Sequence, residues 1–280
     1  MIPDKFEYIR PTNLDEALSL LTKHGEDAKL LAGGQSLIPI MKLRLARPRV
    51  LIDIANLKEL RAVSDDNGRL KIGSMTTHFE IESSDLIAEK CPLLNEVAPH
   101  IGDVQVRNRG TIGGSLVHAD PGADWPAAIL ALEAELEIAS PNGRRTVKAN
   151  DFFLDMLQSD IKPTEILTTI RVHKTSSSVG YLKFAQKASG FAVVGVAAVI
   201  EKTKNAVRLG ITGVAAKPYR PTAVEESLQG KSLDKETISK AATKAATDIK
   251  PLNDLQASSE FRIHLASVLT RRVLEKANAS

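Results

Sequence analysis

The stretch Leu30-Leu31-Ala32-Gly33-Gly34-Gln35-Ser36 decides how the first part of this chain folds, and it has a counterpart in Gly110-Thr111-Ile112-Gly113-Gly114-Ser115. Each stretch places a Gly-Gly pair and a serine beside a short apolar run. Adjacent glycines leave backbone N–H groups uncovered by side chains, and a set of such groups binds phosphate oxygens. Either stretch alone is typical of a tight turn after a strand. Two such stretches together predict a clamp that holds the diphosphate of a dinucleotide.

The composition is that of an ordinary globular protein. With 280 residues, of which 43% are apolar and 25% charged, the chain is long enough for about two domains. A net charge of +3, with both signs interleaved, argues against a nucleic-acid-binding surface. The start of the chain lacks the residue order of a signal peptide, and the longest apolar run, residues 191–200, is too short to cross a membrane. We therefore expect a cytoplasmic protein that binds no nucleic acid and does not span a membrane.

The residues that could hold a metal are few. Cys91 is the one cysteine, which excludes a disulfide framework and a set of iron–sulfur ligands in this chain. His118 and Asp120 have a spacing found in metal sites, but nothing nearby completes a ligand set. Asp120 and Asp124 leave two interpretations open, an acid/base pair or a cap for the helix that begins near Pro126. We expect no metal site.

The order of elements predicts an α+β fold. A helix that begins at the capping pair Asn13 and Glu16 lies between predicted strands at residues 29–32 and 50–54. Hairpins or loops join most of the strands that follow, which are predicted at residues 70–74, 135–139 and 166–172. That connectivity is unlike a doubly wound parallel sheet, in which helices join successive strands.

The last third of the chain predicts a second, antiparallel unit. A break in composition at residues 173–180 is the best candidate for a linker. Strands are predicted at residues 180–186, 191–200 and 206–215, and helices at residues 222–228, 235–249 and 259–277. Such a sequence is typical of a three-stranded meander covered by helices.

Common catalytic motifs are missing. Neither glycine stretch has the G-x-G-x-x-G spacing of a Rossmann fold, and the chain lacks Walker, G-x-S-x-G and H-E-x-x-H motifs. The chain therefore has no evident nucleophile or metal of its own. A protein built to hold a diphosphate-containing cofactor, and little else, indicates chemistry that the cofactor carries.

The two glycine stretches closely resemble the two FAD-binding motifs of the medium subunits of molybdenum hydroxylases. This family includes the flavoprotein subunit of aerobic carbon monoxide dehydrogenase and the FAD segment of xanthine dehydrogenases. The resemblance continues into the flanking segments, which are Leu37-Ile38-Pro39, Met41-Lys42-Leu43-Arg44, residues 101–109, His118-Ala119-Asp120-Pro121 with Asp124, and Tyr181-Leu182-Lys183-Phe184. It covers essentially the whole chain.

The resemblance implies a two-part FAD-binding domain of the vanillyl-alcohol-oxidase or PCMH type. This domain would span residues 1–175, with subdomains at about 1–56 and 57–175, and a C-terminal flavoprotein domain with an antiparallel sheet and helices would span residues 178–280. The chain would be the FAD-binding, electron-transfer subunit of an oxidoreductase. Electrons would leave a substrate at a molybdenum–pterin centre in a large subunit and cross [2Fe–2S] clusters in a small subunit. FAD in this chain would pass them to an external acceptor such as a quinone or NAD. The complex would be a dimer of heterotrimers.

The same resemblance assigns cofactor contacts residue by residue. No catalytic residue or metal ligand falls in this chain. FAD contacts fall on Ala32, Gly33, Gly34, Gln35, Ser36, Ile101, Thr111, Ile112, Gly113, Gly114, Ser115, Asp124, Leu167 and Lys183. The alternative interpretation of Ile101 and Leu167 is a role in the core, and the alternative for Lys183 is a solvated position on a strand.

Two departures from the family pattern bear on the site. Gln35 replaces the histidine of well-known carbon monoxide dehydrogenases, which argues against carbon monoxide as the substrate. Gly190-Phe191 stands where many relatives have Asp followed by Tyr or another large residue. Phe191 and Trp125 are each expected either to cover the flavin ring or to pack in the core. A self-sufficient flavin oxidase and a flavin-binding assembly protein remain alternative functions.

Overall fold

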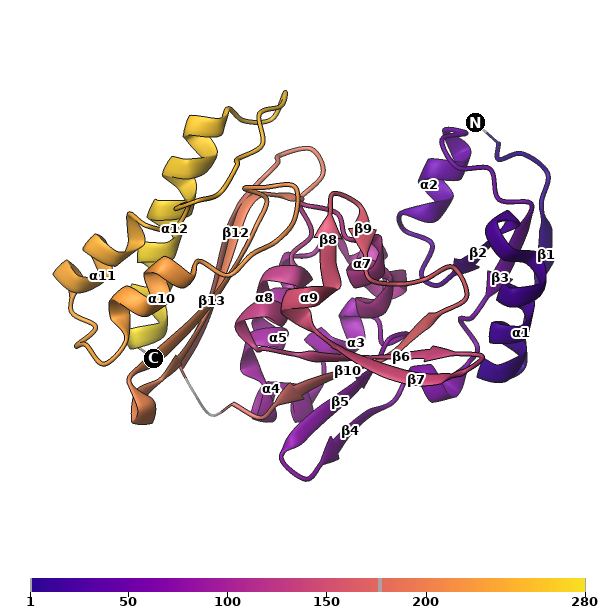
Figure 1. The fold of residues 1–280 in the computed structure, drawn as a ribbon, viewed down its shortest axis with the longest axis horizontal. Coiled ribbons are helices and arrows are strands. Elements are labelled where there is room, and N and C mark those ends of the chain that lie inside the picture. Colours follow the sequence, from indigo (N-terminus) through magenta and orange to yellow (C-terminus); the bar gives the residue numbers. More distant parts are fainter. Residues whose placement is uncertain (1, 176–177, 280) are drawn as a thin grey trace.

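The first layer of the molecule is a small parallel sheet. The computed structural model describes residues 2–175 and 178–279, and the sheet order is β1-β3-β2 (Figure 1). Its strands are β1 (Glu7–Ile9), β2 (Ala28–Leu31) and β3 (Val50–Asp53). Helix α1 (Leu14–His24) begins where the Asn13 side chain accepts a hydrogen bond from the Glu16 N–H, as the capping pair predicts. It ends at Gly25, whose φ of 53° suits glycine.

The second layer is a five-stranded antiparallel sheet with the order β4-β5-β10-β6-β7. Its strands are β4 (Val63–Asp66), β5 (Arg69–Gly73), β6 (Glu135–Ser140), β7 (Gly143–Lys148) and β10 (Ile166–His173). A separate two-stranded ribbon consists of β8 (Phe153–Asp155) and β9 (Gln158–Ser159). The turn that begins at Pro141 joins β6 to β7, as its Pro-Asn-Gly sequence predicts.

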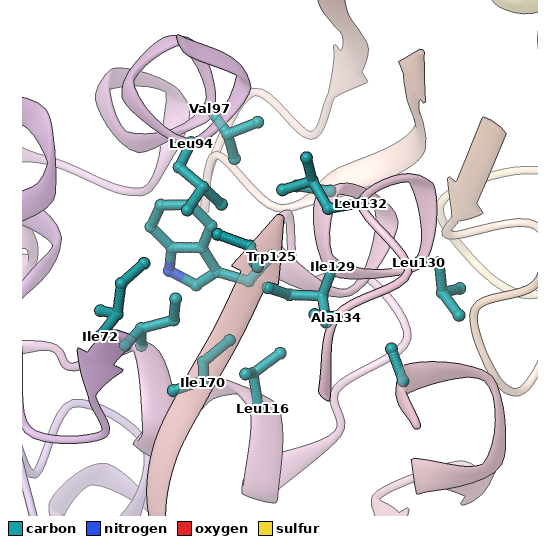
Figure 2. Packing of buried hydrophobic residues seen from close by; sticks show 14 of the residues in the cluster. Ile72, Leu94, Val97, Leu116, Trp125, Ile129, Leu130, Leu132, Ala134 and Ile170 are labelled. Atoms are coloured by element: carbon teal, nitrogen blue, oxygen red, sulfur yellow. The ribbon is translucent and has the colours of Figure 1, made fainter. Parts of the chain in front are cut away.

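Short helices pack on this sheet and enclose the main core. They are α3 (His78–Glu82), α4 (Asp85–Lys90), α5 (Pro92–Val97), α6 (Val104–Arg109), α7 (Ile112–His118), α8 (Trp125–Ala131) and α9 (Ala149–Phe152). Helix α2 (Leu37–Lys42) lies instead with the parallel sheet of the first layer (Figure 1). Trp125 lies fully buried at the centre of this core, among Leu94, Val97, Ile72 and Ile170 (Figure 2). The tryptophan therefore fixes α8 between the sheet and helix α5.

The third layer is an antiparallel sheet of β11 (Ser178–Ala185), β12 (Ala192–Glu201) and β13 (Ala206–Thr212). Helix α12 (Ser259–Ala279), with α10 (Thr222–Leu228) and α11 (Lys235–Ala242), covers its outer face, and α5 and α8 cover the inner face (Figure 1). Alternate residues of β12 therefore enter different cores: Val196, Ala198 and Ile200 pack toward the C-terminal helices, and Ala197 and Val199 pack toward Trp125. A strand buried on both faces explains the uninterrupted apolar run.

The architecture confirms the predicted α+β class, with a C-terminal antiparallel sheet and helices. The predicted linker at residues 173–180 is partly taken up by strands, since β10 ends at His173 and β11 begins at Ser178, and residues 176–177 lie outside the described residues. The helix predicted at residues 235–249 ends at Ala242 and continues as turns. No helix in the described part of the chain is long and apolar enough to cross a membrane.

Candidate functional site

A cavity of about 500 Å³ lies between the first and second layers. One wall is the segment from β2 into α2, and the opposite wall is α7 with the residues before it. The two glycine stretches therefore face each other across one cavity, although they are far apart in the sequence. Its size is that of pockets that bury drug-sized ligands and cofactors.

The first glycine stretch offers a row of free donors. None of the hydrogen bonds found among the described residues uses the backbone N–H groups of Gly33, Gly34, Gln35 or Ser36. Gly34 has a φ of 76°, in the left-handed region that favours glycine. Consecutive N–H groups in such a turn form a concave anion site. This segment therefore has the geometry that the sequence predicts for a phosphate nest.

The second glycine stretch is built differently from the prediction. It forms most of helix α7, and its N–H groups are engaged within the protein. Ile112 donates to the Thr76 carbonyl at 3.0 Å, Gly113 to the Ser74 carbonyl at 2.8 Å, and Gly114 to the Thr111 hydroxyl at 3.1 Å. The expectation of a second open N–H nest is therefore wrong.

Two donors of the second stretch stay free for a ligand. They are the Thr111 N–H and the Ser115 hydroxyl, neither of which takes part in a hydrogen bond found among the described residues, and both residues line the cavity. The second wall can thus contribute to a diphosphate site, but through fewer donors than the first.

The glycines also allow neighbouring segments of the chain to approach closely, and Gly33 does so between the two walls. A Cβ on Gly33 would lie 2.1 Å from the carbonyl oxygen of Arg109, and a Cβ on Gly113 would lie 2.5 Å from the Cβ of Ser74. Both distances are far below any real contact, and Arg109 meets Gly33 with its backbone, which has little freedom to move. The reason for glycine at these positions is therefore packing of protein against protein.

A buried ionic cluster adjoins the cavity at Asp124. Asp124 accepts hydrogen bonds from the Tyr181 hydroxyl and from the Lys183 ammonium, the latter at 2.9 Å. The Asp124 and Lys183 side chains are 5% and 6% exposed. Burial raises the pKa of Asp124 above its usual value, and the Lys183 charge opposes that shift. The alternative of a solvated Lys183 is wrong, because its ammonium is held inside.

The capping role, one of the two that the spacing of Asp124 left open, is wrong. The Asp124 side chain makes no capping hydrogen bond to α8, although the residue stands at the helix N-cap. Asp120 accepts a hydrogen bond from the N–H of Gly122 at 2.8 Å. Both residues line the cavity, as does His118. No group of metal-ligating side chains is found among the described residues.

The two aromatic candidates, Phe191 and Trp125, differ in their position relative to the cavity. Phe191 lines the cavity and is 41% exposed, and it follows Gly190, whose φ is 74°. Trp125 is fully buried and is not part of the cavity wall. Its indole N–H donates to Nδ1 of His78 at 3.0 Å. Phe191 thus keeps its interpretation as a cofactor-covering residue, and Trp125 belongs to the core.

The structure brings together nearly all of the predicted contact residues. Two of them stand outside the cavity wall: Ile112, whose side chain is in the core, and Lys183, which reaches the cavity through Asp124. Ile101 and Leu167 line the wall and also contact the core, so both of their interpretations hold at once.

Sequence reasoning missed residues that the wall also contains. Ser74 and His78 line the cavity beneath the second glycine stretch. The Thr77–Glu80 capping pair predicts a helix start there, and the structure has it, but nothing in the local pattern indicates that His78 would face a site.

Comparison with known proteins decides the family. Residues 4–174 match the model of the FAD binding domain in molybdopterin dehydrogenase, and residues 180–277 match that of the CO dehydrogenase flavoprotein C-terminal domain. The chain belongs to the FAD-binding medium subunits of molybdenum hydroxylases. Members of this family are flavoprotein subunits of oxidoreductases, and this chain is therefore an oxidoreductase subunit.

Individual relatives agree with this assignment over their full lengths. The carbon monoxide dehydrogenase medium chain of Hydrogenophaga pseudoflava is 40% identical over 99% of this chain and 98% of its own length. The glyceraldehyde dehydrogenase medium chain of Sulfolobus acidocaldarius is 36% identical over 99% of each.

Solved structures show the same fold. This chain is similar to a chain of the H. pseudoflava carbon monoxide dehydrogenase that lacks the Mo-pyranopterin moiety, with a TM-score of 0.96, 41% identity, and coverage of 100% of this chain and 99% of that one. A chain of quinoline 2-oxidoreductase from Pseudomonas putida 86 superimposes with a TM-score of 0.94 at 33% identity, with coverage of 100% and 99%.

Proposed function

We propose that this chain holds FAD in the cavity between the two glycine stretches and relays electrons through it. The electrons come from [2Fe–2S] clusters of a small partner subunit and pass to an external acceptor such as a quinone or NAD. A large molybdopterin subunit oxidises the substrate, and the complex is a cytoplasmic dimer of heterotrimers. The observation that carries the proposal is the row of free N–H groups at Gly33–Ser36, facing a second wall with free donors.

The residues present fit FAD. A diphosphate needs several donors, and the N–H row together with Thr111 and Ser115 provides them. Asp124, Ile101, Leu167 and Phe191 lie elsewhere in the same wall, where apolar and polar groups can orient the flavin ring. Bound FAD would supply one-electron and two-electron redox chemistry. The chain's own residues bind, orient and shield it from water.

The domain boundaries follow the same division. We propose an FAD-binding domain at residues 1–175, with subdomains at about 1–56 and 57–175, and a C-terminal flavoprotein domain at residues 178–280. The cavity lies between the parallel sheet of the first subdomain and helix α7 of the second. Substrate choice then lies with the large subunit, and Gln35, which is in the cavity wall, bears on the cofactor.

A variant of Ser115 tests the site without disturbing the fold. Its hydroxyl has no partner among the described residues, so Ser115→Ala should leave thermal stability unchanged. Loss of one hydrogen bond to a phosphate should raise the Kd for FAD about tenfold. Ser227→Ala, on helix α10, is the matched control. If the wild-type chain takes up no FAD, or if the Ser115 variant binds it as the wild type does, the proposed site is contradicted.

Reduction in the complex separates the proposal from its alternatives. We expect flavin in the assembled complex to be reduced by the substrate of the large subunit, and the isolated chain to show no turnover with organic substrates and oxygen. Sustained turnover by the isolated chain would favour a flavin oxidase. Flavin that stays oxidised in the working complex would favour an assembly protein.

A further inference from the structure

His78 is a buried histidine in the cavity wall that the two glycine stretches do not account for. It opens helix α3 and is 4% exposed. Its backbone N–H donates to the Gly110 carbonyl at 3.0 Å, so the residue is fixed to the segment that leads into α7. The ring is therefore held in place from both ends, by the backbone on one side and by Trp125 on the other.

Trp125 determines which nitrogen of His78 carries the proton. An indole N–H can only donate, so Nδ1 of His78, at 3.0 Å from it, must accept. The neutral ring then carries its hydrogen on Nε2. Burial, with a smaller contribution from the positive charge of Arg107, lowers the pKa of His78 to about 4. At neutral pH the residue is an uncharged Nε2–H donor with one fixed orientation.

That donor has no acceptor among the residues that the structure describes. Nε2 lies beside Gly110, at 2.7 Å from the position where a Cβ on Gly110 would stand. No hydrogen bond found among the described residues uses Nε2, and the neighbouring Thr111 N–H is equally free. His78, Gly110 and Thr111 all line the cavity. Nε2 is not among the buried side-chain atoms that lack a partner, so it is open to the cavity, and two donors that line one cavity without an acceptor among the described residues indicate an acceptor from outside the chain.

We propose that His78 is a ligand-binding residue whose Nε2–H donates to a phosphate oxygen of the bound dinucleotide. The inference deepens the proposed function and rests on it. Three features favour phosphate over the flavin ring: the free Thr111 N–H beside Nε2, the free Ser115 hydroxyl one helical turn further, and the N–H row on the facing wall. Gly110 has no side chain that would cover the Nε2 edge of the ring.

Two substitutions separate this role from a structural one. His78→Asn keeps an acceptor for the Trp125 indole but is too short to place a donor at Nε2. His78→Gln can place an amide donor near Nε2 but moves the group that accepts from Trp125. A ligand-binding role predicts weaker binding for His78→Asn than for His78→Gln. A purely structural role predicts the reverse order.

The experiment measures the Kd of the flavin-free full chain for FAD, ADP and riboflavin, with the thermal midpoint of each variant as the control for folding. We expect His78→Asn to raise the Kd for FAD and for ADP about tenfold, to leave riboflavin binding unchanged, and to keep most of the thermal stability. We expect His78→Gln to recover most of the lost affinity.

Unchanged affinity of His78→Asn for FAD and ADP would overturn the inference while leaving the proposed function intact. An equal loss for riboflavin would also overturn it, because riboflavin has no phosphate. A wild-type chain that binds none of the FAD would contradict the proposed function itself, and the inference with it.

Discussion

Gly33 and Arg109 set how closely the two cavity walls approach. A side chain at residue 33 would meet the backbone carbonyl of residue 109 at 2.1 Å, so the cavity can form only if that position has no Cβ. We expect Gly33→Ala to lower the thermal midpoint by several degrees and to lose FAD affinity at the same time, because the walls must separate. The measurement is thermal unfolding with and without FAD.

Gly68→Ala is the control for this substitution. It also replaces a glycine in a turn, and at a φ of 96°, but with nothing within 4 Å of the new Cβ. It should destabilise the chain by about 1 kcal/mol through backbone strain and leave FAD binding as it is. A Gly33→Ala chain that unfolds at the wild-type temperature would show that the walls are not in contact there.

His78 gives the free energy of unfolding a definite dependence on pH. Its pKa is about 4 in the folded chain and about 6.5 when unfolded, so between these values the unfolded state binds more protons. Stability from this residue is fully present above pH 6.5 and is lost as the pH falls toward 4, by roughly 3 kcal/mol in all. Denaturant titrations at several pH values should show a shallower slope for His78→Asn than for the wild type over this window.

Lys183 and Asp124 form a buried ion pair, so removal of one partner leaves the other buried without a counter-ion. We expect Lys183→Met to destabilise the chain at neutral pH by roughly 3 kcal/mol, because Asp124 stays buried without its counter-ion. The pKa of Asp124, already raised by burial, should rise further. A carboxyl whose folded pKa lies above its unfolded value gains stability as the pH falls, so the deficit should shrink under acidic conditions. A deficit that is constant with pH would argue against a charged pair.

The site was predictable where the sequence marks it with glycine, and less so elsewhere. Gly33-Gly34 indicates an open turn, and the free N–H groups are there. Gly113-Gly114 has the same letters but lies inside a helix, because Thr111 caps it and Ser74 accepts from it. Ser74 is distant in the sequence, and the Thr111 cap exists only when the segment is helical. A local sequence pattern therefore shows neither partner. His78 has no local signal at all.

At the scale of elements, one buried arginine adds polar contacts to the apolar packing of helix α12 on its sheet. The Arg262 guanidinium, 3% exposed, donates to the carbonyls of Val193 and Gly213 at 2.7 and 2.6 Å and forms a two-point pair with Asp254. Arg262→Met would leave those acceptors unpaired, and we expect a loss of about 3 kcal/mol in unfolding free energy. Arg262→Lys should recover part of it, since an ammonium retains the charge but not the planar fork. Equal stabilities of all three chains would contradict this role.

Helices and strands that the local sequence marks clearly were predictable, and those that depend on distant contacts were not. The helix from residue 14 has a cap, an apolar face and a terminating glycine, and it forms as expected. Strand β1 (Glu7–Ile9) has three residues and is defined by its register with β3, a contact that no local pattern contains. The helix that begins at Lys235 ends at Ala242, although the apolar pattern continues beyond it. The rest of that pattern forms turns around Asp248, a residue with a φ of 59°.

At the scale of the whole molecule, Tyr181, Ala197 and Val199 join the C-terminal sheet to the core around Trp125. We therefore expect the described parts to unfold together. Trp125 is the one tryptophan in the sequence, so its fluorescence reports on the middle core, and far-ultraviolet circular dichroism reports on all helices and strands. The two signals should give coincident transitions in denaturant. Two separated transitions would show that the C-terminal unit is independent.

Strand β12 supplies alternate side chains to two interiors. Suppose that recombination joined residues 1–175 of this chain to the C-terminal part of a relative. The relative's β12 would then supply side chains to the core around Trp125, while the rest of that core came largely from this chain. At 36% identity, as with the S. acidocaldarius medium chain, few such junctions would keep complementary surfaces. The segments that two separate family models describe are thus expected to be inherited together, as a single evolutionary unit.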